Sequence, residues 1–125
     1  MIKYNFSGHP VPGFELAFFI GREFPSDGTA LVLTMRDTLL QLPHRNELLL
    51  GEIPQIVLPG LSQAAAVLLA EWHGQFGNFP RIQWATRRDN AFVYPVESSA
   101  DLSMVRAQAR SALSLIHISE PTRPY

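Results

Sequence analysis

The sequence contains no cysteine among its 125 residues. Disulfide bonds, thiolate metal sites and cysteine nucleophiles are therefore excluded, and the composition agrees with a cytoplasmic location. The formal net charge is only −1, so the chain lacks the basic surface that binding of long nucleic acid requires. No apolar run approaches the roughly 18 residues of a membrane span, and the N-terminus lacks the pattern of a signal peptide.

Several sequence motifs of common enzymes are also missing. There is no G-x-G-x-x-G or Walker pattern, so a dinucleotide-binding or NTP-hydrolysing domain lacks its motif. There is no G-x-S-x-G motif of a hydrolase nucleophile. The histidines outside the C-terminal segment are too scattered to form a recognisable metal site: His9, His44, His73. We therefore expect neither a metal ion nor another cofactor.

The C-terminal segment differs in origin from the rest. The sequence LSLIHISEPTR at Leu113–Arg123 resembles the in-frame translation of a transposon-based sequencing adapter. We assign residues 113–125 to this artefact and give them no functional weight. Hydrophobic residues make up 46% of the chain and charged residues 17%, which is typical of a folded domain. We expect a single α/β domain over residues 1–112.

The stretch Ile56–Ile82 carries the strongest fold signal. It combines a buried strand, a Pro-Gly turn, an apolar helix, a glycine stop and a second strand. This order predicts the βαβ unit of a parallel sheet. We expect the hydroxyl of Ser62 to cap the helix at its start, and either Gly74 or Gly77 to end it in the left-handed conformation.

Before this unit, the sequence predicts a short strand at Ile2–Phe6. The apolar segment Phe14–Ile20 fits a helical turn or a strand equally well. The run ALVLTM at Ala30–Met35 has the character of a buried strand. The leucine-rich segment Arg36–Leu50 predicts two short helices separated at Pro43.

After the unit, the sequence predicts an antiparallel hairpin at the edge of the sheet. Its strands are Pro80–Thr86 and Ala91–Val96, and its polar turn is Arg87–Asn90. Ser99 is expected to cap a final helix, in which four apolar residues share one stripe: Leu102, Val105, Ala109, Ala112.

Two predicted turns follow strands of the parallel sheet, where ligands of open α/β sheets bind. They are Asn5–Pro10 and Pro59–Ser62. The first offers polar groups, and the second offers a glycine for close approach and the positive end of a helix dipole. The alternative is that these residues serve only turn formation and capping. The candidate ligand-binding residues are Asn5, Ser7, Gly8, His9, Pro59, Gly60, Leu61 and Ser62.

Three segments together resemble a known family. They are NFSGHP at Asn5–Pro10, PGL with an alanine-rich helix ending in LLAEWHGQFGNFPRI at Leu68–Ile82, and LSMVRAQAR at Leu102–Arg110. They resemble the small CRISPR-associated proteins encoded beside type III interference genes (the Csx-fifteen type). The resemblance covers the first ten residues and most of Gln55–Ala112, and none of its motifs is a catalytic signature.

The resemblance implies a Rossmann-like three-layer domain with a mostly parallel sheet and a C-terminal antiparallel hairpin. It further implies a homodimer that binds a cyclic oligoadenylate second messenger, sequestering or sensing it in type III antiviral defence. One alternative is a metal-independent ring nuclease in which His9 acts as acid or base, because His9 is the only such candidate at the strand ends. Another is a protein-interaction module without a ligand.

Overall fold

The fold is built on a mixed, mostly parallel five-stranded sheet. A computed structural model describes the backbone of residues 1–119 and the side chains of residues 1–113. The strand order is β2-β1-β3-β4-β7; β2, β1, β3 and β4 are parallel, and β7 is antiparallel to β4. The strands are β1 (Lys3–Asn5), β2 (Leu16–Ala17), β3 (Gln55–Val57), β4 (Arg81–Gln83) and β7 (Ser99–Asp101). The predicted α/β class is therefore confirmed.

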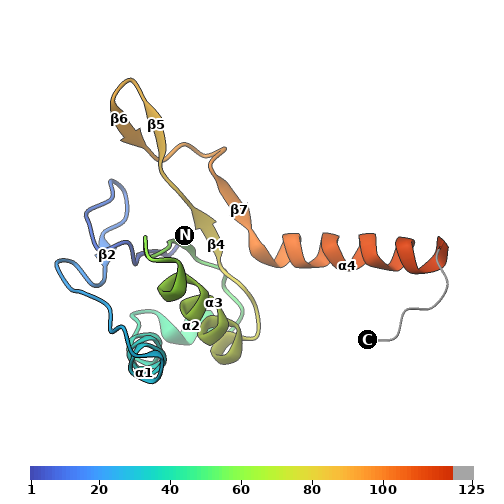
Figure 1. Ribbon diagram of the computed structural model, residues 1–125, viewed down its shortest axis with the longest axis horizontal. Helices are drawn as coiled ribbons and strands as arrows, with labels where there is room; N and C mark the ends of the chain where they lie inside the picture. Colours follow the sequence, from blue (N-terminus) through green and yellow to red (C-terminus); the bar gives the residue numbers. More distant parts are fainter. Residues whose placement is uncertain (120–125) are drawn as a thin grey trace.

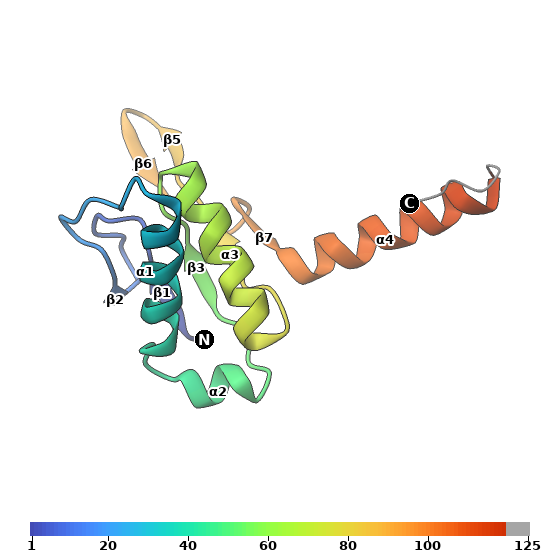
Figure 2. The same cartoon turned by 60° about the horizontal axis from the view of Figure 1, so that its bottom comes forward.

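Two long helices, α1 (Gly28–Leu40) and α3 (Ser62–Phe76), connect the parallel strands. The sheet advances in one direction from β1 to β3 to β4, so right-handed crossovers place both helices on the same face. Figure 2 shows α1 and α3 side by side in front of the sheet. The predicted three-layer arrangement is therefore wrong: within residues 1–119, no helix covers the opposite face.

The main core lies between the sheet and this helix pair. Trp72 of α3 is fully buried, and its ring contacts those of Tyr4 and Phe6 edge-on, at centroid distances of 6.1 and 6.4 Å. Burial of each large apolar side chain contributes about 1.5–3 kcal/mol. The buried helix residues recur every four positions, as one face of a helix requires: Leu31, Met35 and Leu39 of α1 and Ala64, Leu68 and Trp72 of α3.

The opposite face of the sheet has a smaller apolar cluster beside polar side chains. Val57 packs there with Val11, Phe14 and Tyr94. Next to them, the side-chain amide of Gln55 donates a hydrogen bond to Gln83 across the strands, at 2.9 Å. This face is therefore closed by a loop and a few side chains.

The segment Ala30–Met35 is helical, and its prediction as a strand was wrong. The carboxylate of Asp27 accepts a hydrogen bond from the backbone N–H of Ala30 at 2.9 Å and caps α1. In the helix Leu31 is buried while Leu33 is 54% exposed. The run resembles a strand because α1 is apolar on its outer face as well.

The segments around α1 resolve two further expectations. The predicted break at Pro43 is confirmed, since α1 ends at Leu40 and α2 covers Arg45–Leu49. The first of the two predicted helices is the second half of α1. The open segment Phe14–Ile20 contains the two-residue strand β2.

The predicted hairpin does not form the edge of the sheet. Its strands, β5 (Thr86–Arg88) and β6 (Ala91–Val93), form a separate two-stranded sheet that projects from the domain (Figure 1). Asp89 and Asn90 form its turn with φ of 49° and 63°, as tight hairpin turns require. The edge partner of β4 is instead β7. Gln83 fixes this bend, because its amide donates to the carbonyls of Tyr94 and Pro95 at 2.7 and 3.1 Å.

Two predicted helix caps were also wrong. Ser62 is the first residue of α3, and the N-cap is Leu61, whose side chain makes no capping hydrogen bond. Ser99 lies in β7, and the last helix is capped by Asp101, whose carboxylate accepts from the N–H groups of Ser103 and Met104 at 3.1 and 3.2 Å. At the other end of α3, Gly77 supplies the left-handed residue, with φ of 75°.

The last helix, α4 (Leu102–Ser119), leads away from the rest of the domain (Figure 1). Its side chains from Met104 to Leu113 are all exposed. The segment assigned to the adapter begins inside α4, and its residues 120–125 lie outside the described residues. Among the described helices, none has the combined length and apolar character needed to traverse a bilayer.

Candidate functional site

The carboxyl ends of β1, β3 and β4 surround one pocket of about 260 Å³. β3 lies between β1 and β4 in the sheet, and the carboxyl ends of parallel strands share an edge. The two turns singled out in the sequence therefore meet at this strand-end pocket. Its lining includes Ser7 and His9 after β1, Leu58, Pro59 and Gly60 after β3, Trp84 and Ala85 after β4, and Tyr94.

Asn5 organises the first turn and does not line the pocket. It is fully buried at the end of β1. Its side-chain oxygen accepts hydrogen bonds from the N–H and the hydroxyl of Ser7, at 2.9 and 2.6 Å. Its amide nitrogen donates to the carbonyl of His9 at 2.6 Å. Asn5 and the Ser7 hydroxyl, both expected to contact the ligand, are thus engaged within the loop.

Gly8 and His9 form the tip of this turn. Gly8 has φ of 87° and a Cβ there would meet the carbonyl oxygen of Phe19 at 3.6 Å, so the position favours glycine through its backbone conformation. His9 is exposed and lines the pocket. Among the described lining residues, it is the one side chain whose ordinary titration falls near neutral pH.

The second turn leads directly into the N-terminus of α3. Pro59 and Gly60 line the pocket, whereas the predicted site residues Leu61 and Ser62 are exposed beside it. The first amides of α3 have no side-chain cap, in contrast to α1, which Asp27 caps. An uncapped N-terminus keeps N–H donors and the positive end of the helix dipole available to an anion.

Two aromatic residues of the pocket were not identified from the sequence. Trp84 follows β4 and is 45% exposed, although its sequence context favoured a core or interface position. Tyr94 lines the pocket from the segment after β6. The signal for Trp84 was its place at the end of a third parallel strand. Exposed aromatic faces are surfaces on which planar groups stack.

Formal charge contributes little to this pocket. Its described lining contains neither lysine, arginine, aspartate nor glutamate. On the nearby hairpin, Arg88 is paired with Glu97 at 2.6 Å. The described residues hold no group of three or more metal-ligating side chains. Attraction for an anion therefore depends on backbone N–H groups, and recognition of an uncharged planar group depends on Trp84 and Tyr94.

Comparison of the chain with protein-family models, with curated proteins and with solved structures found no match. The fold and the pocket define the class: a mixed α/β domain with an aromatic-lined pocket at the carboxyl ends of its parallel strands. The argument for a particular ligand rests on the chemistry of that pocket.

Proposed function

We propose that this chain is a cytoplasmic CRISPR-associated accessory protein that binds a cyclic oligoadenylate, sequestering or sensing it in type III antiviral defence. The supporting observation is the strand-end pocket, in which two turns and Trp84 lie beside the uncapped N-terminus of α3. The Rossmann-like relation to sensor domains is part of this proposal and rests on the sequence resemblance.

The pocket offers partners for both parts of a nucleotide. A phosphate binds the amides at Gly60 and at the start of α3, as anions do at helix N-termini. An adenine stacks on Trp84 or Tyr94, and one base stacked on an aromatic side chain contributes about 1–3 kcal/mol. This pairing of amides with aromatic side chains suits a nucleotide better than a free inorganic anion.

The size of the pocket bears on the number of copies. Its volume of about 260 Å³ lies below the range of about 300–1,000 Å³ that holds drug-sized ligands. One pocket therefore accommodates about one nucleotide unit, and a ring of several units needs more than one pocket. A two-fold homodimer supplies two equivalent pockets to a ligand with rotational symmetry.

Ring cleavage is the second candidate function, and His9 favours it. Attack of a ribose 2′-hydroxyl on the adjacent phosphate needs a base for the hydroxyl proton and donors for the developing charge. His9 lines the pocket, but no carboxylate among the described residues orients its ring. An efficient general base is normally held by a third group, so we favour binding over cleavage.

Calorimetric titration with cyclic trimer, tetramer and hexamer tests the proposal, with micromolar or tighter binding of one ring expected. A Gly60→Glu variant should bind at least tenfold more weakly, because its carboxylate repels phosphate at the amides. The matched control is Gly28→Glu at the start of α1. A Cβ meets nothing within 4 Å at either glycine, so both variants should fold.

The outcomes separate the candidates. Absence of heat for every ring overturns the proposal. Linear products in a metal-free assay, lost in His9→Ala, would identify the protein as a ring nuclease. Equal binding by the Gly60 and Gly28 variants would remove the pocket from the account.

A further inference from the structure

Helix α4 carries an apolar seam that nothing in the described chain covers. The seam residues follow the 3-4-3 spacing of a heptad pattern: Leu102, Val105, Ala109, Ala112. The helix touches β4 and β7 at its beginning, and its side chains from Met104 onward are exposed up to Leu113. A helix with such a seam is expected to pack against other helices.

A second uncovered apolar surface lies between the two helices of the main layer. Two adjoining hollows, of about 500 and 680 Å³, share Val32, Arg36 and Val67. We call this surface the α1–α3 groove. It lies on the side of the helices away from the sheet (Figure 2). Leu33 contributes to its rim, while Ala70 and Gly74 of α3 allow close approach of a third helix.

The α4 helix cannot reach the groove of its own chain. β7 ends at Asp101 and α4 begins at Leu102, so no linker separates them. The Asp101 cap fixes the first turn, and the hydroxyl of Ser103 accepts from the N–H of Phe79 at 3.2 Å. Figures 1 and 2 both show α4 leading away from α1 and α3. The helix that fills the groove must therefore come from another molecule.

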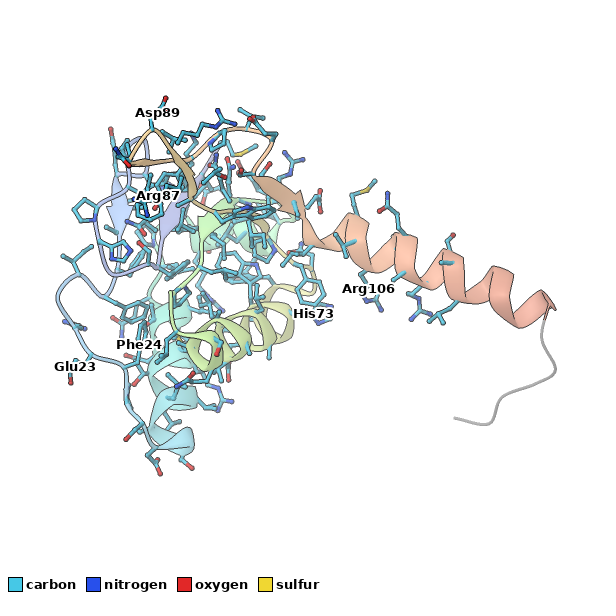
Figure 3. All side chains as sticks on the ribbon, turned by 45° about the horizontal axis from the view of Figure 1, so that its top comes forward. Glu23, Phe24, His73, Arg87, Asp89 and Arg106 are labelled. Carbon is cyan, nitrogen blue, oxygen red and sulfur yellow. The ribbon has the colours of Figure 1, made fainter. Side chains whose placement is uncertain are left out.

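The charges favour this groove over a second α4 as the partner of the seam. Residues 102–113 carry two arginines and no acidic residue, a charge of +2: Arg106, Arg110. The helices of the groove, with the α1 cap, carry three carboxylates and one guanidinium, a charge of −2: Asp27, Asp37, Glu71, Arg36. Figure 3 shows Arg106 on α4, away from the body of the domain. Pairing two α4 helices would bring like charges together, which is unfavourable.

We propose that α4 of one copy docks in the α1–α3 groove of a second copy, and that the exchange is reciprocal. The resulting two-fold arrangement is closed, since each copy gives one helix and receives one. It contains two helix–groove contacts, which is how short helices reach the roughly 1,200–2,000 Å² of a stable interface. The groove shares no residue with the lining of the strand-end pocket, so this inference stands independently of the proposed ligand.

Light scattering coupled to size exclusion tests the dimer with a matched pair of variants of the full chain. Ala109→Glu places a charge on the seam and should convert the dimer to a monomer. Ala107→Glu lies about 160° around the helix from it and should remain a dimer. Both alanines are exposed, so folding should be equally affected. A monomer for the unmodified chain at every concentration, or dimers for both variants, would overturn the proposal.

Cross-linking identifies the surfaces that meet. Because the chain has no cysteine, Ala109→Cys and Ala70→Cys each introduce a single thiol, one on the seam and one in the groove. A bifunctional maleimide should join the two variants when they are mixed and should leave each variant alone uncross-linked. Cross-linking of Ala109→Cys with itself would mean that two α4 helices pair. Cross-linking of Ala70→Cys with itself would mean that two helix layers pair; either result contradicts the proposal.

Discussion

The helix layer over the sheet and the C-terminal elements are both rich in apolar residues, yet only the first is packed. Trp72 in α3 is 0% exposed, whereas Phe92 in β6 is 71% exposed. α1 and α3 connect parallel strands, and a crossover must return across the sheet, which buries its inner face. The β5–β6 hairpin and α4 extend from one edge and do not return. Connectivity, more than apolar content, decides what is buried here.

The largest expected effect tests this comparison with one aromatic residue from each region. Trp72→Ala should lower the free energy of unfolding by about 3–5 kcal/mol, because it opens a cavity in the core. Phe92→Ala should change it by about 0.5 kcal/mol or less, as substitutions at exposed sites do. Urea unfolding measures both. Similar losses for the two variants would show that the hairpin is packed in solution.

A pH dependence distinguishes the core from the surface through Tyr4. Burial, followed by the nearby Glu47 and Glu52, raises the pKa of Tyr4 to about 12, and its hydroxyl donates to the carbonyl of Pro43. In the unfolded chain the pKa is about 10. The native state therefore holds its proton longer, and this contribution to stability is complete below pH 10 and lost as the pH rises from 10 to 12.

The loss attributable to Tyr4 should reach about 2–3 kcal/mol by pH 12. Unfolding by urea at a series of pH values measures it. Tyr4→Phe removes the titrating group and should flatten the profile over this range. Parallel profiles for the two proteins would contradict the buried, protonated state of Tyr4.

The loop after β1 depends on Asn5. Asn5→Ala should cost about 1–3 kcal/mol, because the carbonyl of His9 and the N–H of Ser7 lose their partner. The matched control is Asn46→Ala, at an exposed site in α2, which should change stability by about 0.5 kcal/mol or less. Thermal unfolding compares them. Equal effects would mean that Asn5 does not hold the turn.

The smallest effects come from two glycines with opposite expected signs. Gly8→Ala should destabilise the protein by about 1–2 kcal/mol, since a side chain is strained at its positive φ. Gly74→Ala should stabilise it by about 0.5–1 kcal/mol, because Gly74 lies inside α3 with open space around it. Unfolding midpoints of both variants in urea settle the signs, and two shifts in the same direction would contradict this difference.

The sequence predicted well those elements whose signals are local and agree with one another. The unit Ile56–Ile82 has a strand, a turn and a helix ended by Gly77, and all are present. Ala30–Met35 was mistaken for a strand because α1 is apolar on its outer face too. The edge partner of β4 depends on Gln83, whose long-range hydrogen bonds leave no local signal.

The site was predictable where it depends on backbone order. Two turns that follow adjacent parallel strands must meet, and His9 and Gly60 do line one pocket. The role of Asn5 was not predictable, since an asparagine that binds a ligand and one that holds a turn have the same sequence pattern. Trp84 was missed because its exposure depends on how the chain turns away from the sheet after β4.

The most direct test of the central claim is a ¹H–¹⁵N correlation spectrum recorded during titration with cyclic tetra-adenylate. The amide signals of Gly60, Ser62 and Gln63, at the uncapped start of α3, should shift, together with the indole N–H signal of Trp84. The amides of Gly28 and Ala30, at the capped start of α1, should not move. A ligand that leaves the α3 amides unchanged, or that shifts both helix starts equally, would contradict the account.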